Sequence, residues 1–167
     1  TQDGKLVPNT EYYYAATDER TLIKCLTPHR TEHVIYDGIQ EIISNSPFGR
    51  RKTIWGFQVD TLLATSVGME NPQRAYTTSI GSVIAIGSPN DVRDYDPFGE
   101  FTNISAISTP LPYGFCGKRY DIELELYYGR ARLYDPQSGR FIQPDPMGTI
   151  DGSNLYLYAR NNPLTYV

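Results

Sequence analysis

Short hydrophobic runs rich in aromatic and β-branched residues alternate with polar turns along most of the chain. This alternation, at spacings of roughly 8–12 residues, is typical of a meander of antiparallel strands. No stretch of about 12 residues has the apolar period of an amphipathic helix. The strands that the pattern predicts are residues 11–16, 21–26, 32–36, 39–43, 52–58, both halves of 76–86, and 92–95.

Other parts of the chain lack this pattern. We expect residues 59–73 to make an irregular crossing and the Ser/Thr/Pro-rich residues 102–112 to form a surface loop. Residues 154–161 allow at most one short turn of helix. Asp37-Gly38 is predicted to close a hairpin, because this dipeptide favours two-residue turns. The fold class that follows is all-β.

The second half of the chain carries three related turn sequences, beginning at Asp96-Pro97, Asp135-Pro136 and Asp145-Pro146. Proline fixes φ at the first corner of a turn, the following glycine supplies a positive φ, and aspartate accepts hydrogen bonds from the turn amides. Tyrosines precede the first two and fit the ends of half-buried strands. We therefore expect Asp96 and Asp135 to cap their own turns.

Composition narrows the class of protein. The 167 residues fit one domain or a piece of a larger assembly, and 14 tyrosines, 14 glycines and 12 prolines favour short strands and tight turns. A net charge of −4 gives no support for nucleic-acid binding, which usually needs a basic surface. No apolar run approaches the roughly 18 residues of a membrane span.

Metal and cofactor sites are not predicted. The two cysteines, Cys25 and Cys116, are too few for a disulfide framework, and we expect each to be a small buried hydrophobic residue, although a bridge between them stays open. The only histidines are His29 and His33, so a four-ligand zinc site is not expected. We predict no cofactor.

A longer series of motifs resembles a known family. Residues 76–167 are similar to the final YD-repeat hairpins and the Rhs repeat-associated core of Rhs/YD-repeat proteins, and residues 1–75 fit as looser YD repeats. We accordingly divide the chain into repeat strands at 1–114 and a core at 115–167. The core motifs are Phe115–Asp121, Leu126–Pro136, Gly139-Arg140-Phe141, Pro144–Gly148, Asn154–Ala159 and Asn161-Asn162-Pro163.

This resemblance implies an antiparallel YD-repeat sheet that forms part of a hollow shell and ends in a core plug. In the similar C subunits of insecticidal toxin complexes, the shell encloses a C-terminal toxin, and the core is an aspartyl autoprotease. The family's first catalytic aspartate matches Asp145, and we match its supporting arginine to Arg140. The second aspartate would follow Val167, so we expect this chain alone to be inactive.

Two carboxylates suit peptide hydrolysis, because two aspartates held close share one proton, so that one acts as base while the other acts as acid. An arginine can orient the charged one. The alternatives are structural. Asp145 would then only cap its turn, and Arg140 would pack on Tyr134 or Phe141. We expect Arg130 and Arg132 to stack between tyrosines across strands.

The resemblance also implies partners and a location. The partners are the protein's own C-terminal toxin and the rest of the shell, with a delivery-complex subunit as a further candidate. The location is secreted, or delivered by a secretion system. An alternative from the same resemblance is an adhesion or recognition module without cleavage, like the YD-repeat shell of animal teneurins. The family usually has glycine at the position of Glu125, so we expect the turn before Leu126 to differ here.

Overall fold

Two antiparallel sheets make up the fold in the computed structural model, which describes residues 11–14, 22–26, 31–46, 49–88, 92–103, 112–163 and 165–166. The larger sheet has eight strands in sequence order, so each strand pairs with its neighbours along the chain. They are β1 Glu11–Tyr14, β2 Leu22–Leu26, β3 Thr31–Asp37, β4 Gln40–Ser46, β5 Gly49–Trp55, β6 Leu62–Val67, β7 Gln73–Thr77 and β8 Val83–Ile86.

The smaller sheet has four strands, again in sequence order. They are β9 Arg119–Asp121, β10 Leu126–Gly129, β11 Arg132–Asp135 and β12 Arg140–Phe141. The described residues contain no α-helix, only short 3₁₀ turns such as η2 Phe115–Gly117, η3 Gly148–Asp151 and η4 Ala159–Asn161. The all-β antiparallel prediction is confirmed. η4 is a single short turn within 154–161, and its residues have positive φ, so its backbone is left-handed.

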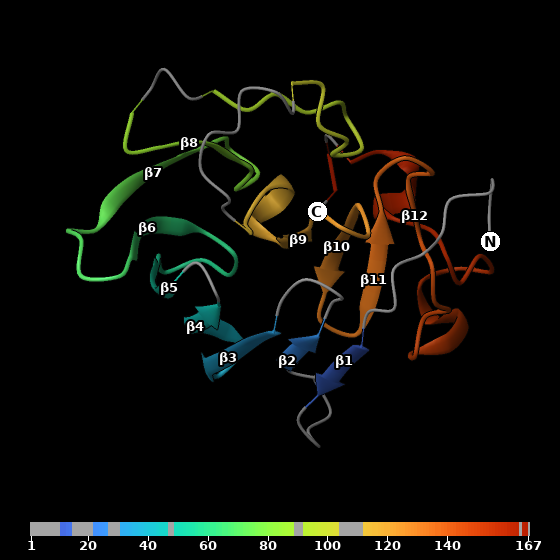
Figure 1. The fold of residues 1–167 in the computed structure, drawn as a ribbon. Helices are drawn as coiled ribbons and strands as arrows, with labels where there is room; N and C mark the ends of the chain where they lie inside the picture. The colour runs from blue at the N-terminus through green and yellow to red at the C-terminus, as the bar shows by residue number, and fades with distance from the viewer. Residues whose placement is uncertain are drawn as a thin grey trace.

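The larger sheet is curved. In Figure 1 its strands follow an arc from β1 at the bottom to β8 at the upper left, and the smaller sheet lies within this arc. The register shifts in several strand pairs, β3 with β4 and β5 with β6 among them, and such bulges increase twist and bending. Along β3, Glu32 and Val34 are buried while His33 and Ile35 are exposed. The inner face of the arc therefore carries polar as well as apolar side chains.

Tyrosines form the core of the smaller sheet. Tyr127 on β10 lies opposite Tyr134 on β11, and both are fully buried. Their hydroxyls donate to the carbonyls of Gly99 and Phe98, at 2.9 Å and 2.7 Å. The first Asp-Pro turn is thereby fastened to the core, and each ring is buried without leaving its hydroxyl unpaired. The buried members of this cluster are Phe115, Cys116, Tyr127, Tyr134 and Tyr158.

The expected turn capping is present. Oδ1 of Asp96 accepts hydrogen bonds from the main-chain N–H groups of Phe98 and Glu100, at 2.9 Å and 2.8 Å. Oδ1 of Asp135 accepts one from Gln137 at 3.0 Å. Both are the side-chain-to-backbone bonds that make aspartate a turn residue. The capping prediction for these two aspartates is confirmed.

The prediction of an irregular crossing at 59–73 is wrong, because β6 occupies its centre. Leu62 is buried there, but so is the polar residue Thr65, which pairs with buried Thr53 on the inner face of the sheet. A buried polar residue breaks the hydrophobic pattern by which a strand is predicted. The turn before Leu126 also keeps a left-handed residue, since Glu125 has φ 60°, contrary to expectation. Residues 104–111 of the predicted loop lie outside the described residues.

The buried tyrosines make stability sensitive to alkaline pH. Burial raises the pKa of Tyr127, Tyr134 and Tyr158 above the ordinary value of about 10. Since the unfolded chain loses these protons first, their contribution to stability is complete below pH 10 and declines as pH rises further. We expect unfolding and tyrosinate absorbance to rise together above pH 10. Tyrosines that all titrated near pH 10 in a folded protein would contradict this.

Candidate functional site

Asp145 begins the third Asp-Pro turn and is held by its main chain and by one side-chain oxygen. Its N–H donates to the carbonyl of Leu155 at 3.0 Å, and its own carbonyl accepts from Gly148 at 3.0 Å. Oδ1 accepts a hydrogen bond from the N–H of Met147 at 2.9 Å. The carboxylate therefore caps its turn, as the structural alternative predicted, and Oδ2 remains available for another contact.

Arg132 makes that contact. Its Nη1 lies 2.8 Å from Oδ2 of Asp145, and both side chains are 18% exposed. The guanidinium also lies 3.6 Å from the centre of the Phe141 ring. The ring under Arg132 is thus a phenylalanine rather than the predicted pair of tyrosines. Stacking on one side and an ion pair on the other fix the orientation of the guanidinium, and hence of the carboxylate.

The structure places Arg140, the predicted partner of Asp145, elsewhere. Arg140 pairs with Asp135 in the β11–β12 register, while Phe141 pairs with Tyr134. Because side chains alternate between the faces of a strand, Arg132 shares the buried face of Tyr134 and Phe141, and Arg140 lies on the other face. Its exposed side chain lines a separate cavity of about 440 Å³, together with Asp96, Phe98, Pro136, Gln137, Ser138, Gly139 and Asn161.

The alternation of side chains between the two faces of a strand was the sequence signal that could have identified Arg132. Arg132 precedes Tyr134 by two residues, so the two share a face whenever 132–135 is a strand. Arg140 is closer to Asp145 in sequence and is next to Phe141, but its side chain lies on the opposite face of the strand from Phe141. The role of Arg140 in catalysis stays a prediction, and the geometry favours Arg132.

A cavity of about 420 Å³ adjoins the Asp145–Arg132 pair. Tyr166, near the end of the chain, lines the same cavity, and its N–H donates to the carbonyl of Asn162 at 3.0 Å. The walls combine one acidic and two basic residues with apolar ones. The lining residues are Arg132, Phe141, Asp145, Gly148, Gly152, Asn154, Leu155, Leu157, Tyr158, Ala159, Arg160 and Tyr166.

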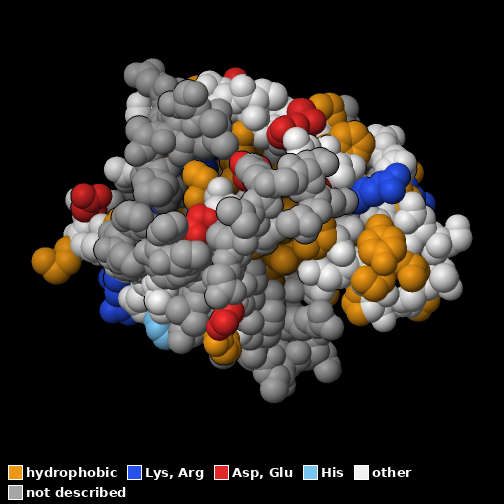
Figure 2. Space-filling model, turned by 45° about the vertical axis from the view of Figure 1, so that its right-hand side comes forward, with side chains coloured by type: hydrophobic (Ala, Val, Ile, Leu, Met, Phe, Trp, Pro, Cys, Tyr) orange, Lys and Arg blue, Asp and Glu red, His pale blue; other side chains and the backbone are white. Residues whose placement is uncertain are grey.

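The surface around the C-terminal segments is partly apolar. Figure 2 shows a group of hydrophobic side chains on the right of the molecule. Exposed apolar residues of the C-terminal segments are Ile142, Met147, Ile150, Tyr156 and Tyr166. An oriented carboxylate beside a partly apolar cavity is suited to general acid–base chemistry on a chain segment that enters it.

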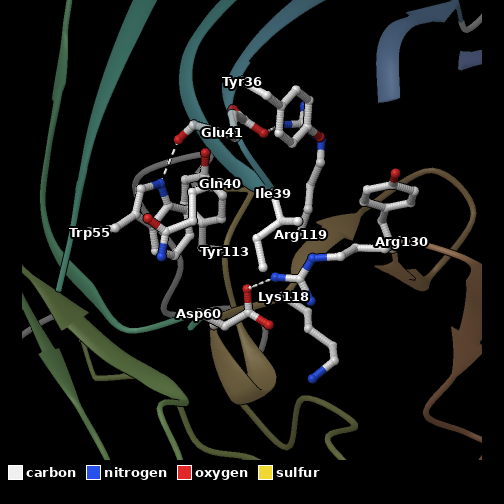
Figure 3. Close-up of a pocket in the computed structure, with 12 residues that line it drawn as sticks. Tyr36, Ile39, Gln40, Glu41, Trp55, Asp60, Tyr113, Lys118, Arg119 and Arg130 are labelled. Carbon is white, nitrogen blue, oxygen red and sulfur yellow. Dashed lines mark hydrogen bonds and ion pairs between the residues drawn. The ribbon is translucent and has the colours of Figure 1, made fainter. Parts of the chain in front are cut away.

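A second cluster of charges joins the two sheets. Arg119 on β9 reaches Glu32 on β3 at 2.5 Å and Glu41 on β4 at 2.7 Å, with both carboxylates at most 4% exposed. Figure 3 shows Arg119 and Glu41 on either side of this junction. Burial alone would lower the pKa of Arg119, but the carboxylates outweigh it and hold the pKa above its ordinary value. The guanidinium is therefore charged.

Arg130 and Asp60 form another link between the sheets, an ion pair that Figure 3 shows directly. Both residues have left-handed backbones, with φ 59° and 61°. Gly117 packs so closely on the Asp60 carbonyl that an added Cβ would lie 1.8 Å from its oxygen. Arg130 is thus paired with Asp60, while Tyr36 and Tyr128 line the adjoining cavity. That cavity, at about 30 Å³, has room for little more than a water molecule, so we interpret it as structural.

Cys116 is buried and free, as expected, and its sulfur lies 3.6 Å from the Tyr158 hydroxyl. The side chain of Cys25 and all of His29 lie outside the described residues. Within the described parts, no three His, Cys, Asp or Glu residues gather as metal ligands. Nor does any helix there have the length and apolar character needed to cross a membrane.

Several known proteins with similar sequences are toxins. Toxin subunit YenC1 of Yersinia entomophaga is 36% identical over 108 residues, which are 60% of this chain and 11% of YenC1. Double-stranded DNA deaminase toxin A of Burkholderia cenocepacia is 33% identical over 130 residues, 70% of this chain and 9% of that toxin. Toxin protein Tse5 of Pseudomonas aeruginosa is 46% identical over 52 residues, 31% of this chain and 4% of Tse5. No family model matches the chain.

The fold agrees with these sequences. The crystal structure of TcdB2-TccC3-TEV contains a similar fold, with a TM-score of 0.73 at 23% identity. The match covers all of the present chain and 9% of the chain in that crystal structure. The chain belongs to the Rhs/YD-repeat proteins. It spans about a tenth or less of the length of these three toxins. The sequence prediction of the Rhs/YD-repeat family and of its antiparallel fold is thus confirmed, and the region is of the Rhs type associated with toxins.

Proposed function

We propose that this chain is part of a shell that encloses a C-terminal toxin, and that the core of the full protein releases the toxin by cutting its own chain. Residues 1–114 would supply wall strands and residues 115–167 the plug. Support comes from the toxin relatives, from the curved sheet with a second sheet inside its arc, and above all from the Asp145–Arg132 pair at a cavity that Tyr166 also lines.

The position of Tyr166 brings substrate and catalyst together. Tyr166 lines the cavity that holds Asp145, so a peptide bond shortly after Tyr166 in a longer chain would reach the site without diffusion of a separate substrate. The same segment can supply the second carboxyl group that the family resemblance implies. Asp145 and that group would share one proton, with Arg132 stabilising the charged form of Asp145.

The reaction is hydrolysis of a peptide bond. One carboxylate takes a proton from water as the water oxygen bonds to the carbonyl carbon, while the protonated carboxyl donates a hydrogen bond to the carbonyl oxygen. The C–N bond then breaks, and the amine leaves with a proton. Arg132 keeps the carboxylate of Asp145 oriented throughout, because its guanidinium is fixed between Oδ2 and the Phe141 ring.

Partners and location follow from the same proposal. The partners are the toxin segment and the remaining shell strands, and the TcdB2-TccC3 structures support a delivery subunit as a further one. The protein would act after secretion or delivery to a target cell, in keeping with its toxin relatives. Such a shell needs no metal or cofactor for cleavage, since two carboxyl groups suffice.

Arg132 provides the test of this function. In a longer chain that continues past Val167, we expect Arg132→Met to slow self-cleavage roughly ten- to hundredfold, the effect of losing a hydrogen bond to a charged group. Methionine retains an apolar side chain of similar length over Phe141. Cleavage is followed by intact-mass measurement over time, and chain 1–167 alone should keep its mass.

Arg140→Met is the matched control, because Arg140 is exposed on the opposite face of the sheet. It should cut at the wild-type rate, and both variants should melt within a few degrees of wild type. The account of the site is overturned if Arg140→Met cuts slowly and Arg132→Met does not. A wild-type chain that never cuts would favour the adhesion alternative.

A further inference from the structure

The turn after Tyr158 has an unusual backbone. Ala159, Arg160 and Asn161 are three successive non-glycine residues in the left-handed region, with φ 45°, 51° and 57°. Residues other than glycine and asparagine rarely adopt this conformation, and left-handed residues normally occur singly rather than in runs. A strained turn of this kind persists only where its surroundings hold it in place.

Buried residues hold the turn at both ends. Tyr158 is 5% exposed, and its ring centre lies 4.3 Å from that of Tyr134 and 5.7 Å from that of Phe141. Pro163, just after the turn, is also buried. The turn is closed by hydrogen bonds from Asn161 to Tyr158 and from Asn162 to Ala159, at 2.9 Å and 2.8 Å. The core thus fixes the direction in which the chain leaves Asn161.

That direction leads to the cavity of Asp145. The N–H groups of Thr165 and Tyr166 donate to the carbonyl of Asn162 at 3.1 Å and 3.0 Å. The Arg160 guanidinium lies 5.4 Å from the centre of the Tyr166 ring, within range of a cation–π contact. Arg160 and Tyr166 both line the cavity of Asp145. A glycine at position 160 would remove the strain, but it would also remove this contact.

We propose that Arg160 is a positioning residue, held by the left-handed turn, that fixes Tyr166 and the chain after it against the cavity of Asp145 and Arg132. This role rests on the proposed self-cleavage. Arg160 touches the segment that leads to the substrate bond and not the reacting atoms. Its cation holds the ring from one side, while the carbonyl of Asn162 holds the backbone of Tyr166.

The first experiment measures the position of Tyr166 in chain 1–167 by NMR, independently of cleavage. We expect Arg160→Ala to speed exchange of the Tyr166 amide about two- to fivefold, the effect of losing an exposed cation–π contact, and to shift the Tyr166 ring signals. Arg160→Lys keeps a cation and should stay within about twofold of wild type. Arg140→Ala, which removes another exposed arginine, should leave Tyr166 unchanged.

Tyr166→Leu removes the other half of the contact and gives a second route to the same result. It should speed exchange of the same amide as much as Arg160→Ala, and the double variant should add little, because the two side chains form one contact. Unchanged exchange in Arg160→Ala, an equal change in Arg140→Ala, or fully additive effects in the double variant would overturn the inference.

The second experiment measures cleavage in a chain continued past Val167. We expect Arg160→Ala to slow self-cleavage about two- to fivefold and Arg160→Lys to restore it. Faster exchange at Tyr166 with an unchanged cleavage rate would overturn the positioning role and leave the proposed cleavage standing. A wild-type chain that does not cut would overturn the proposed function, and the positioning role with it.

Discussion

Replacing Arg119 with methionine will lower the free energy of unfolding by about 3–5 kcal/mol, the cost of removing one partner from a buried ion pair. Arg119 faces two carboxylates, Glu32 and Glu41, that are at most 4% exposed. Without the guanidinium, two negative charges from neighbouring strands would be left close together and away from water. A loss of this size is a large share of the free energy of unfolding of an ordinary domain.

Urea denaturation of chain 1–167 measures this loss, with Arg140→Met as the control. Arg140 is exposed, so its substitution should change stability by no more than about 0.5 kcal/mol. Adding Glu32→Gln and Glu41→Gln to Arg119→Met should recover part of the loss, because the uncompensated charges are then gone. If Arg119→Met were as stable as Arg140→Met, the ion pairs would not hold the sheets together.

Polar and charged contacts between the two sheets make their relative position specific. The inner face of the larger sheet buries polar residues such as Ser44, Thr53 and Thr65 beside the charged cluster. Hydrogen bonds and ion pairs need defined geometry, whereas apolar contacts are non-directional. The Thr53 and Tyr113 hydroxyls lie 3.2 Å apart across this face. We infer that polar contacts set the position of the smaller sheet within the arc.

The sequence predicted most strands because their ends are marked by turn residues. Turn signals such as Asp37-Gly38 reflect local backbone preference, which needs no knowledge of distant contacts. The strand at 62–67 was missed for the opposite reason. Thr65 is buried on the inner face of the sheet, against a polar interior that forms only when strands far apart in sequence come together. No local hydrophobic pattern marks such a strand.

The candidate site was predictable only in the part that depends on local sequence. Asp145 stands in a recognisable turn, and its capping bond to Met147 follows from local geometry. Its partner Arg132 comes from strand β11, so finding it needed the register of β11 and β12 as well as the motif. The contact between Arg160 and Tyr166 depends on a left-handed turn at residues that do not favour one, which a sequence pattern does not reveal.

Asp145→Asn, in a chain that continues past Val167, will slow self-cleavage about 10²–10⁴-fold, the usual contribution of a general acid or base. Asparagine keeps the size of aspartate and an oxygen that can accept the Met147 hydrogen bond. It cannot take up the proton that the reaction requires. Asp135→Asn is the matched control, since Asp135 caps the preceding Asp-Pro turn with the same kind of bond.

The most direct test is a denaturing gel of these two variants beside the wild type, sampled over time. The account predicts that wild type and Asp135→Asn appear as two pieces, while Asp145→Asn remains a single chain that is still folded and melts within a few degrees of wild type. Normal cleavage of Asp145→Asn would contradict the account, because it would reduce Asp145 to a residue that only caps its turn.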